Sequence, residues 1–224
     1  MGLKSGIITI KSRKRKRTIS LSLGSDGRIF LRVPYHLTDE KIQEFLLSKR
    51  EWLESKLKNL KEIKPRKFMA GEKFPYFGRL HPLRLECSEE KRPLVFSNDE
   101  FVLAKDSLDQ ARELFIAWYK NEAHQKLRER IDHYSGPMGL EAVPMKITSA
   151  LCRWGSCSTS NTLNFPWRIA MLPLGSIDYI VVHELAHTKE KNHSEKFWKL
   201  VSLIMPDYKE RKKWLNENGF YFAF

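Results

Sequence analysis

Two histidines in the C-terminal part of the chain are four residues apart. They are His183 and His187, and Glu184 follows the first of them in the pattern H-E-x-x-H. Residues at this spacing on a helix lie one turn apart on the same face. Both imidazoles can therefore reach one zinc ion at the usual ~2.0–2.1 Å. Glu184 lies about 100° round the helix from His183, which places it near a water in the open fourth position, as a general base requires.

A third histidine, His193, follows His187 after five intervening residues. Asn192 tolerates a left-handed backbone conformation, so the chain is expected to leave the helix there and bring His193 back to the ion. Ser194 is the expected N-cap of the next helix. His193 is therefore the preferred third metal ligand.

Other ligands remain open. Gluzincin-type enzymes use a glutamate on a second helix, and Glu195 or Glu210 could take that role. The spacing of His193 is metzincin-like, but Glu190 stands where metzincins have glycine, so the chain must turn by another route. A purely structural zinc site would need a fourth protein ligand, for which the candidates are Cys152, Cys157 and Glu190.

The chemistry expected of this site is metal-assisted hydrolysis. Zinc lowers the pKa of a bound water from about 15.7 towards ~7, and a general base such as Glu184 contributes typically ~10²–10⁴-fold in rate. Arg153 and Tyr208 have the right chemistry to contact the transition state or the substrate. The alternatives are a structural ion pair or cation–π contact for Arg153 and a core ring for Tyr208. Trp154 and Trp167 are interpreted as packing residues.

Hydrophobic patterning predicts the elements of the N-terminal part. Alternating polar and apolar residues at 18–23 and 28–33, joined by an Asp-Gly turn, predict a β-hairpin. A helix is expected over 39–60, with Thr38 as its N-cap. Short strands are expected between 68 and 103, where Gly and Pro recur.

The C-terminal part is predicted to contain a long helix, then strand-like stretches from about residue 140, then the H-E-x-x-H helix and one or two further helices. A long helix is expected over 107–134, stopped by a Gly-Pro pair. The segment 161–169 is expected to be an edge strand along which an extended peptide could lie. Ser176 is the expected N-cap of the H-E-x-x-H helix. These patterns predict an α+β fold, with a β-rich region containing one helix at 1–105 and a zincin-like catalytic domain at 106–224.

Composition limits the class of protein. The chain has 224 residues, of which 42% are apolar, and a formal net charge of +13. No apolar run approaches the ~18 residues that span a bilayer, and the first residues lack the apolar region of a secretory signal. Three cysteines do not make a disulfide framework. A cytoplasmic location without a membrane partner is therefore expected.

Basic residues gather at the N-terminus. The first 17 residues hold seven Lys or Arg and no acid, most densely at 11–17. One interpretation is a phosphate-contacting patch for nucleic acid or a nucleotide. The other is a solvated strand or turn, which is favoured because no recognition motif accompanies the charge.

Five motifs of the C-terminal half occur in a fixed order. They are Arg153-Trp154-Gly155-Ser156-Cys157-Ser158, Asn164-x-x-Trp167-Arg168, Ile177-Asp178-Tyr179-x-x-x-His183-Glu184-Leu185-Ala186-His187, Asn192-His193-Ser194-x-x-Phe197-Trp198 and Met205-Pro206-Asp207-Tyr208-Lys209-Glu210-Arg211-x-x-Trp214-Leu215. Together they resemble the YgjP-like metallopeptidase family, which is related to the SprT-like and WLM-type zinc proteases. The resemblance implies a minigluzincin-like zinc metalloprotease domain, with its active-site helix beneath a short sheet.

Three functions follow as hypotheses. The first is a zinc-dependent metallopeptidase that acts on a peptide or protein substrate. The second is a metal-dependent nucleotide hydrolase that cleaves a phosphoanhydride, suggested by the positive charge. The third is a nucleic-acid-associated zinc protein, whose DNA binding should depend on salt and on the basic run at 11–17.

Overall fold

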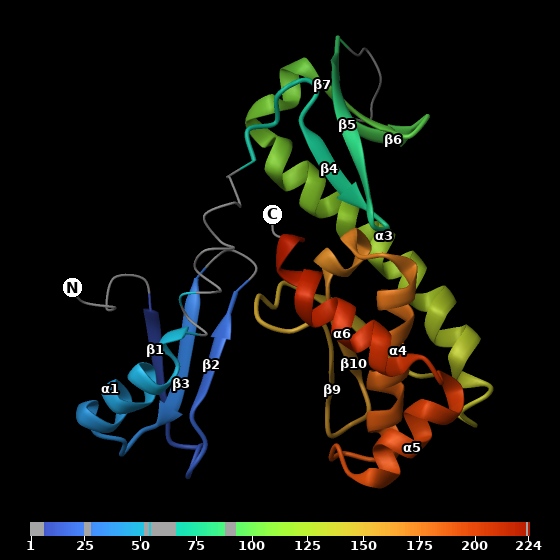
Figure 1. Cartoon of the computed structure of the whole chain (residues 1–224). Coiled ribbons are helices and arrows are strands. Elements are labelled where there is room, and N and C mark those ends of the chain that lie inside the picture. The colour runs from blue at the N-terminus through green and yellow to red at the C-terminus, as the bar shows by residue number, and fades with distance from the viewer. Residues whose placement is uncertain (1–6, 25–27, 52–53, 55–65, 88–92, 223) are drawn as a thin grey trace. The chain divides into compact units, whose positions relative to one another are not determined.

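The computed structural model describes residues 7–24, 28–51, 54, 66–87, 93–222 and 224 (Figure 1). The chain forms two compact units, Met1–Pro65 with Ala223–Phe224, and Arg66–Phe222. The two units divide between residues 65 and 66, whereas the sequence pattern predicted a domain boundary between 105 and 106. The assignment of catalytic function to 106–224 stays a prediction.

The described residues of unit 1 include a three-stranded sheet and the helix α1. Its strands are β1 (Ile7–Ser12), β2 (Ser20–Leu23) and β3 (Ile29–Pro34), in the order β1-β3-β2, and its helix is α1 (Asp39–Ser48). The antiparallel pairing of β2 with β3 confirms the predicted hairpin, whose turn at 25–27 lies outside the described residues.

Alternate residues of β3 build the core of unit 1. Ile29, Leu31 and Val33 are buried, and they form one hydrophobic cluster with Ile42 and Leu46 of α1. Successive side chains of a strand point to opposite faces, so this alternation directs a single apolar face toward the helix.

The first helix is shorter than the pattern predicts. α1 ends at Ser48, and helical residues recur at 50, 51 and 54, while 52–53 and 55–60 lie outside the described residues. Thr38 is the N-cap by its extended backbone, but its side chain makes no capping hydrogen bond.

Unit 2 begins with a four-stranded sheet. Its strands are β4 (Lys73–Tyr76), β5 (Arg79–Glu86), β6 (Leu94–Ser97) and β7 (Glu100–Ala104), in the order β4-β5-β7-β6. These strands confirm the prediction of short strands between 68 and 103.

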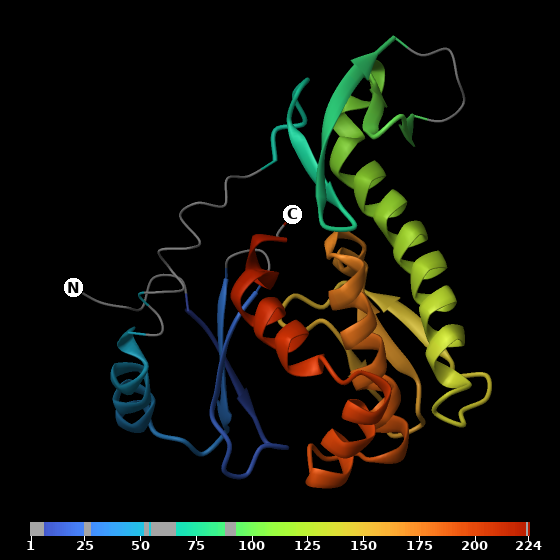
Figure 2. The same cartoon turned by 45° about the vertical axis from the view of Figure 1, so that its right-hand side comes forward.

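The long helix α3 (Ala111–Ser135) packs against this sheet through aromatic rings. The rings of Phe74 and Phe115 stack at 4.3 Å, and Phe101 lies 5.1 Å from Phe115. The hydroxyl of Tyr119 donates a hydrogen bond of 2.7 Å to the carbonyl of Pro75. With 25 residues, α3 is about 37 Å long, and it runs on from this sheet to the elements that carry the histidines (Figure 2).

The expected start of the long helix is wrong by one turn. Residues Lys105–Gln110 form the 3-10 helix η1, and the α-helix begins only at Ala111. Short 3-10 turns are common at helix N-termini. Leu108 is consequently exposed and lies outside the apolar face that the pattern assigned to it.

A second, smaller sheet lies in the C-terminal half of unit 2. It consists of β8 (Met145–Thr148), β9 (Ser156–Cys157) and β10 (Leu163–Pro166), in the order β8-β10-β9. The expectation of an edge strand at 161–169 is therefore wrong, because β10 pairs with a neighbour on both sides. The edge strand that contacts the H-E-x-x-H helix is β9.

Helices complete unit 2. The elements after β10 are η2 (Trp167–Met171), α4 (Leu174–Lys189), α5 (Glu195–Ile204), α6 (Tyr208–Asn218) and η3 (Gly219–Tyr221). α4 packs against α3, α5 and α6. It is buried over most of its length, as expected of a helix that is apolar nearly all round. In the described part of the chain, no helix is long and apolar enough to cross a membrane.

The helix α4 starts earlier than predicted. Its N-cap is Pro173, whose ψ of 145° is not helical, and Ser176 is buried in the first turn. The carbonyl of Pro173 accepts hydrogen bonds from the N–H groups of Ser176 and Ile177. The serine expected to cap the helix is therefore already part of it.

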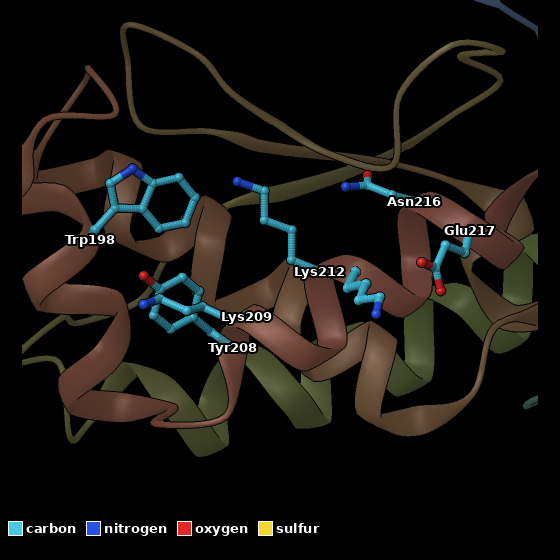
Figure 3. Close-up of a pocket in the computed structure, with 7 residues that line it drawn as sticks. Trp198, Tyr208, Lys209, Lys212, Asn216 and Glu217 are labelled. Carbon is cyan, nitrogen blue, oxygen red and sulfur yellow. The ribbon is translucent and has the colours of Figure 1, made fainter. Parts of the chain in front are cut away.

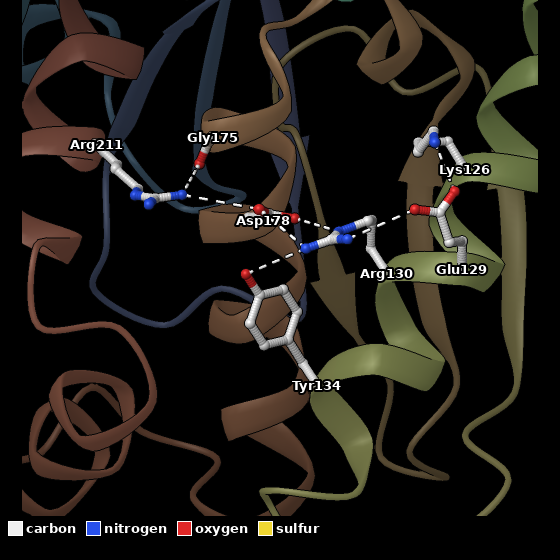
Figure 4. Close-up of polar contacts among 7 residues, drawn as sticks. All are labelled: Lys126, Glu129, Arg130, Tyr134, Gly175, Asp178 and Arg211. Atoms are coloured by element: carbon white, nitrogen blue, oxygen red, sulfur yellow. Dashed lines mark hydrogen bonds and ion pairs between the residues drawn. The ribbon is translucent and has the colours of Figure 1, made fainter.

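A buried carboxylate holds the first turn of α4 to two other helices. Asp178 receives two hydrogen bonds from Arg130 of α3, at 2.6 and 3.2 Å (Figure 4). Arg211 of α6 lies 3.9 Å from the same carboxylate and donates to the carbonyl of Gly175 at 3.0 Å. Charge-assisted bonds of this geometry fix orientation, so this cluster sets the position of α4.

Replacement of Asp178 by Asn is expected to lower the free energy of unfolding by about 2–3 kcal/mol. Breaking a fully buried ion pair costs about 3–5 kcal/mol, and Arg130 and Arg211 are partly solvated. Urea unfolding measures the change. Asp207→Asn is the control, because this more exposed partner of Arg211 should cost under about 1 kcal/mol. Equal losses in the two variants would contradict the assigned role of Asp178.

Candidate metal centre

The structure brings the three predicted histidines together. Their ring nitrogens lie within 4.8 Å of one another, and Nε2 of His183 is 3.0 Å from Nε2 of His193. Two nitrogens that share a tetrahedral ion at ~2.0–2.1 Å are about 3.3 Å apart, so the His183–His193 pair already has nearly this separation. Among the described residues, no other group of three or more His, Cys, Asp or Glu side chains has this geometry.

His187 is held in one tautomer by the backbone. Its Nδ1 lies 2.9 Å from the carbonyl oxygen of Glu190. A carbonyl can only accept a hydrogen bond, so Nδ1 carries the proton and Nε2 keeps its lone pair. Metal-binding histidines are commonly oriented by such a second contact.

The chain leaves α4 by a route that the sequence did not predict. Glu190 caps the helix in an extended conformation, and its N–H donates to the carbonyl of Ala186. Asn192 is not among the described residues with positive φ, so the left-handed turn expected there is wrong. An extended residue at Glu190 already redirects the chain toward His193.

A lysine ties the loop of His193 to the small sheet. Lys191 donates to the carbonyl of Ser158 at 3.2 Å, contacts Sγ of Cys157 at 3.7 Å and also bonds Oδ1 of Asn161. These three partners lie at and after β9. The loop that presents His193 is thereby attached to the edge strand beside α4.

Phe197 forms an apolar floor beneath the three rings. Its ring centroid lies 4.9, 4.5 and 4.8 Å from those of His183, His187 and His193. Phe197 is fully buried and sits in the first turn of α5, where its N–H donates to Oγ of Ser194. The predicted N-cap at Ser194 is confirmed.

Burial keeps His183 in its neutral form. Desolvation, followed by the charges of His187, His193 and Lys212, lowers the pKa of His183 to about 3. The pKa of His193 is also lowered, mainly by burial. Neutral imidazole is the form that binds metal ions.

Glu184 is buried beside the histidines and lies against Gly155. A Cβ atom at position 155 would be 2.5 Å from Oε1 of Glu184 and 2.6 Å from its Cγ. Burial raises the pKa of Glu184 to about 7, and the charge of Arg153 opposes this rise. Oε2 of Glu184 is buried without a hydrogen-bond partner in the described part of the chain. A buried carboxylate oxygen without a partner is costly, and a nearby cation with its water would relieve that cost.

This pKa makes the stability of the metal-free protein depend on pH. Between its ordinary value of 4.5 and about 7, Glu184 is protonated in the folded chain and ionised in the unfolded chain. Stability is therefore lost as the pH rises through this window. The loss reaches about 3 kcal/mol at most, at 1.36 kcal/mol per pKa unit.

The lowered pKa of His183 makes stability rise with pH, opposite to the effect of Glu184. This effect of His183 is the same in wild type and in Glu184→Gln, so comparison of the two proteins isolates the contribution of Glu184. In the presence of a chelator, Glu184→Gln should gain about 3 kcal/mol over wild type between about pH 4.5 and about pH 8. Urea unfolding at the two pH values measures the gain, and the exposed Glu195→Gln should show none. A difference that does not change with pH would contradict the assignment.

Arg153 and Tyr208 both lie near the site. Arg153 is exposed, and its charge reaches the carboxyl of Glu184. The ring of Tyr208 stacks on Trp198 at 5.3 Å, and Trp198 lies 5.7 Å from the ring of His193. Contact of either side chain with a transition state or substrate stays a prediction.

Three neighbours of the site were not predicted as functional residues. Tyr179 lies one turn before His183, with the two rings 5.8 Å apart, and burial raises its pKa to about 12. Its spacing of four residues from His183 could have indicated it. Gly155 and Lys212 gave no signal, because only the fold places them beside α4 and α5. Trp167 is a buried packing residue that stacks on Tyr119, as predicted.

A helix with two histidines and a glutamate, next to a third histidine and a small sheet, defines a metallohydrolase of mixed α+β fold. The family model described as YgjP-like, metallopeptidase domain, matches residues 17–218. The chain belongs to this YgjP-like metallopeptidase family, which confirms the resemblance seen in its motifs. It is therefore a hydrolase of metallopeptidase type that uses a divalent metal.

Comparison with solved structures gives a partial similarity. A crystal structure described as the metallopeptidase zymogen of Pyrococcus abyssi abylysin matches with 23% identity and a TM-score of 0.38. The match covers 41% of this chain and 93% of that chain. No curated protein matches the sequence.

Proposed function

We propose that this chain is a zinc-dependent peptidase in which His183, His187 and His193 hold the ion and Glu184 is the general base. The observation that carries the proposal is a buried oxygen of Glu184 that has no partner among the described residues, on the helix that carries two of the three histidines whose ring nitrogens lie within 4.8 Å of one another. Three histidine nitrogen ligands leave a fourth position open, as catalytic zinc sites require.

A zinc ion bound here supplies a Lewis acid for the substrate carbonyl and makes water acidic enough to act near neutral pH. Glu184 takes the proton of the attacking water and gives it to the leaving amine, so the carboxyl ends each turnover ionised. Gly155 lets this carboxyl lie flat against the backbone before β9. Arg153 or Tyr208 stabilises the developing negative charge on the carbonyl oxygen.

The edge strand β9 is the proposed support for the peptide. Among the described strands it pairs with β10 alone, and it contacts α4, which carries Glu184. An extended peptide can pair with such an open edge through backbone hydrogen bonds. We therefore assign the pairing with an extended peptide, which the sequence pattern placed at 161–169, to Ser156–Cys157.

Positive charge near the site favours a second candidate, nucleotide hydrolysis. Lys209, Lys212 and Lys213 lie on α6 and line a pocket together with Trp198. The ring of Trp198 in turn lies 5.7 Å from that of His193. Binding of nucleic acid by the basic run is less favoured, because Lys11 pairs with Asp39 and Arg13 lies over the ring of Tyr35. A cytoplasmic location is part of the proposal and agrees with three free cysteines.

The test is turnover by the zinc-loaded protein on a panel of unstructured peptides and nucleoside triphosphates, with chelated protein as control. The proposal expects zinc-dependent cleavage of peptides and none of nucleotides. Zinc-dependent cleavage of triphosphates alone would replace it with the second candidate. Turnover that survives chelation would contradict both.

A further inference from the structure

A pocket of about 500 Å³ lies beside the histidine cluster, between α5 and α6. Its residues come from the last two long helices of unit 2 (Figure 3). This volume lies within the usual range of about 300–1,000 Å³ for ligand pockets. The lining residues are Trp198, Tyr208, Lys209, Lys212, Lys213, Asn216 and Glu217.

Trp198 is a wall shared by this pocket and the metal centre. Its ring centroid lies 5.9 Å from that of His183 and 5.7 Å from that of His193, at an interplanar angle of 28° to the latter. On the pocket side it stacks on Tyr208 at an interplanar angle of 17°. A group bound in the pocket is therefore separated from the histidine cluster by the side chain of Trp198.

The pocket is strongly positive. It contains three lysines against one acid, Glu217. Within the described part of the chain, Lys209, Lys212 and Lys213 form no ion pair with a carboxylate. The ammonium of Lys212 lies 4.3 Å from the centre of the Trp198 ring, and Figure 3 shows it between Trp198 and Asn216.

Aromatic walls with unpaired ammonium groups suit an anionic group carried on an apolar stem. An aliphatic stem can contact the rims of the stacked Trp198 and Tyr208 rings that line the pocket, and an anionic end meets Lys212. A cation placed over an aromatic ring keeps its other donors free for an anion. A carboxylate on a short apolar stem has both features.

We propose that this pocket is a substrate subsite that binds a carboxylate of the peptide, either an acidic side chain or a free C-terminus, through Lys212. The inference rests on the proposed peptidase function and adds its specificity. Lys209 and Lys213 raise the local positive potential, and Asn216 offers an amide donor. Lys212 is thus a specificity-determining residue.

Paired peptides test this subsite. One set carries Glu or Gln at successive positions on either side of the scissile bond, and a second set ends in a free acid or an amide. For zinc-loaded wild type we expect kcat/KM to be about 10-fold higher for the acid at one position or terminus. Lys212→Gln should bring this ratio to about 1, whereas the exposed Lys199→Gln should keep the wild-type ratio. The position that shows the effect distinguishes a side chain from a C-terminus.

A binding measurement separates this inference from the proposed function. Calorimetry with the Glu184→Gln protein, which should not turn over the peptide, compares the acidic peptide with its neutral twin. About 10-fold tighter binding of the acid, lost in the double variant with Lys212→Gln, supports the subsite even if wild type cleaves no peptide. Equal cleavage of acid and neutral peptides by wild type, or equal binding, would overturn the subsite and leave the peptidase proposal intact.

Discussion

Replacement of Glu184 by Gln is expected to lower kcat on a peptide substrate by about 10²–10⁴-fold. Glutamine keeps the size and the buried position of the side chain but cannot accept the proton of water. The three histidines and the Phe197 floor do not depend on this side chain, so bound zinc should stay at the wild-type level. The measurement is zinc content and peptide turnover on the same preparation.

Two exposed glutamates provide matched controls for this substitution. Glu195 begins α5 and Glu210 lies in the first turn of α6. Either could be the third ligand of a gluzincin-type site, yet neither belongs to the cluster of ring nitrogens. Glu195→Gln and Glu210→Gln should retain both zinc and activity. If Glu184→Gln kept full activity, the assignment of the base would be wrong.

Replacement of Gly155 by Ala is expected to lower kcat/KM by about 100-fold without loss of zinc. The new Cβ would lie 2.5–2.8 Å from three atoms of the Glu184 side chain, which therefore has to move. A displacement of about 1 Å in a catalytic group costs on the order of 10²-fold. Crowding of this kind also lowers stability by about 1–3 kcal/mol.

Gly136→Ala is the control for this effect. A Cβ at position 136 meets nothing within 4 Å, and its backbone angles are helical. It should leave activity and stability close to wild type. Equal activity in the two alanine variants would show that Gly155 does not position Glu184.

The sequence predicts the centre of the site well, for a physical reason. The spacing of His183 and His187 fixes their relation on any helix, and the apolar residues before them ensure that the helix is buried. The hairpin of unit 1 and the cap at Ser194 are equally local. Such features depend on neighbours in the chain, so a pattern can reveal them.

Features that depend on tertiary contacts escaped the pattern. Gly155 is remote in sequence from Glu184. Only the packing of the two residues in the fold shows that a side chain at position 155 would collide with the Glu184 side chain. The central position of β10 depends on which segments pair with it, and 161–169 alone cannot show this. The turn at Glu190 replaced the one expected at Asn192 because an extended residue and a bond to His187 serve the same purpose.

The most direct test of the central claim is the zinc content of purified wild type, His193→Ala and Glu195→Gln after dialysis against a weak chelator. The three-histidine site predicts about one zinc per chain in wild type and in Glu195→Gln. It predicts an affinity more than about 100-fold weaker in His193→Ala, since loss of a ligand should exceed the 10–100-fold cost of losing its supporting contact. Zinc retained in His193→Ala and lost in Glu195→Gln would contradict the account and make the glutamate the third ligand.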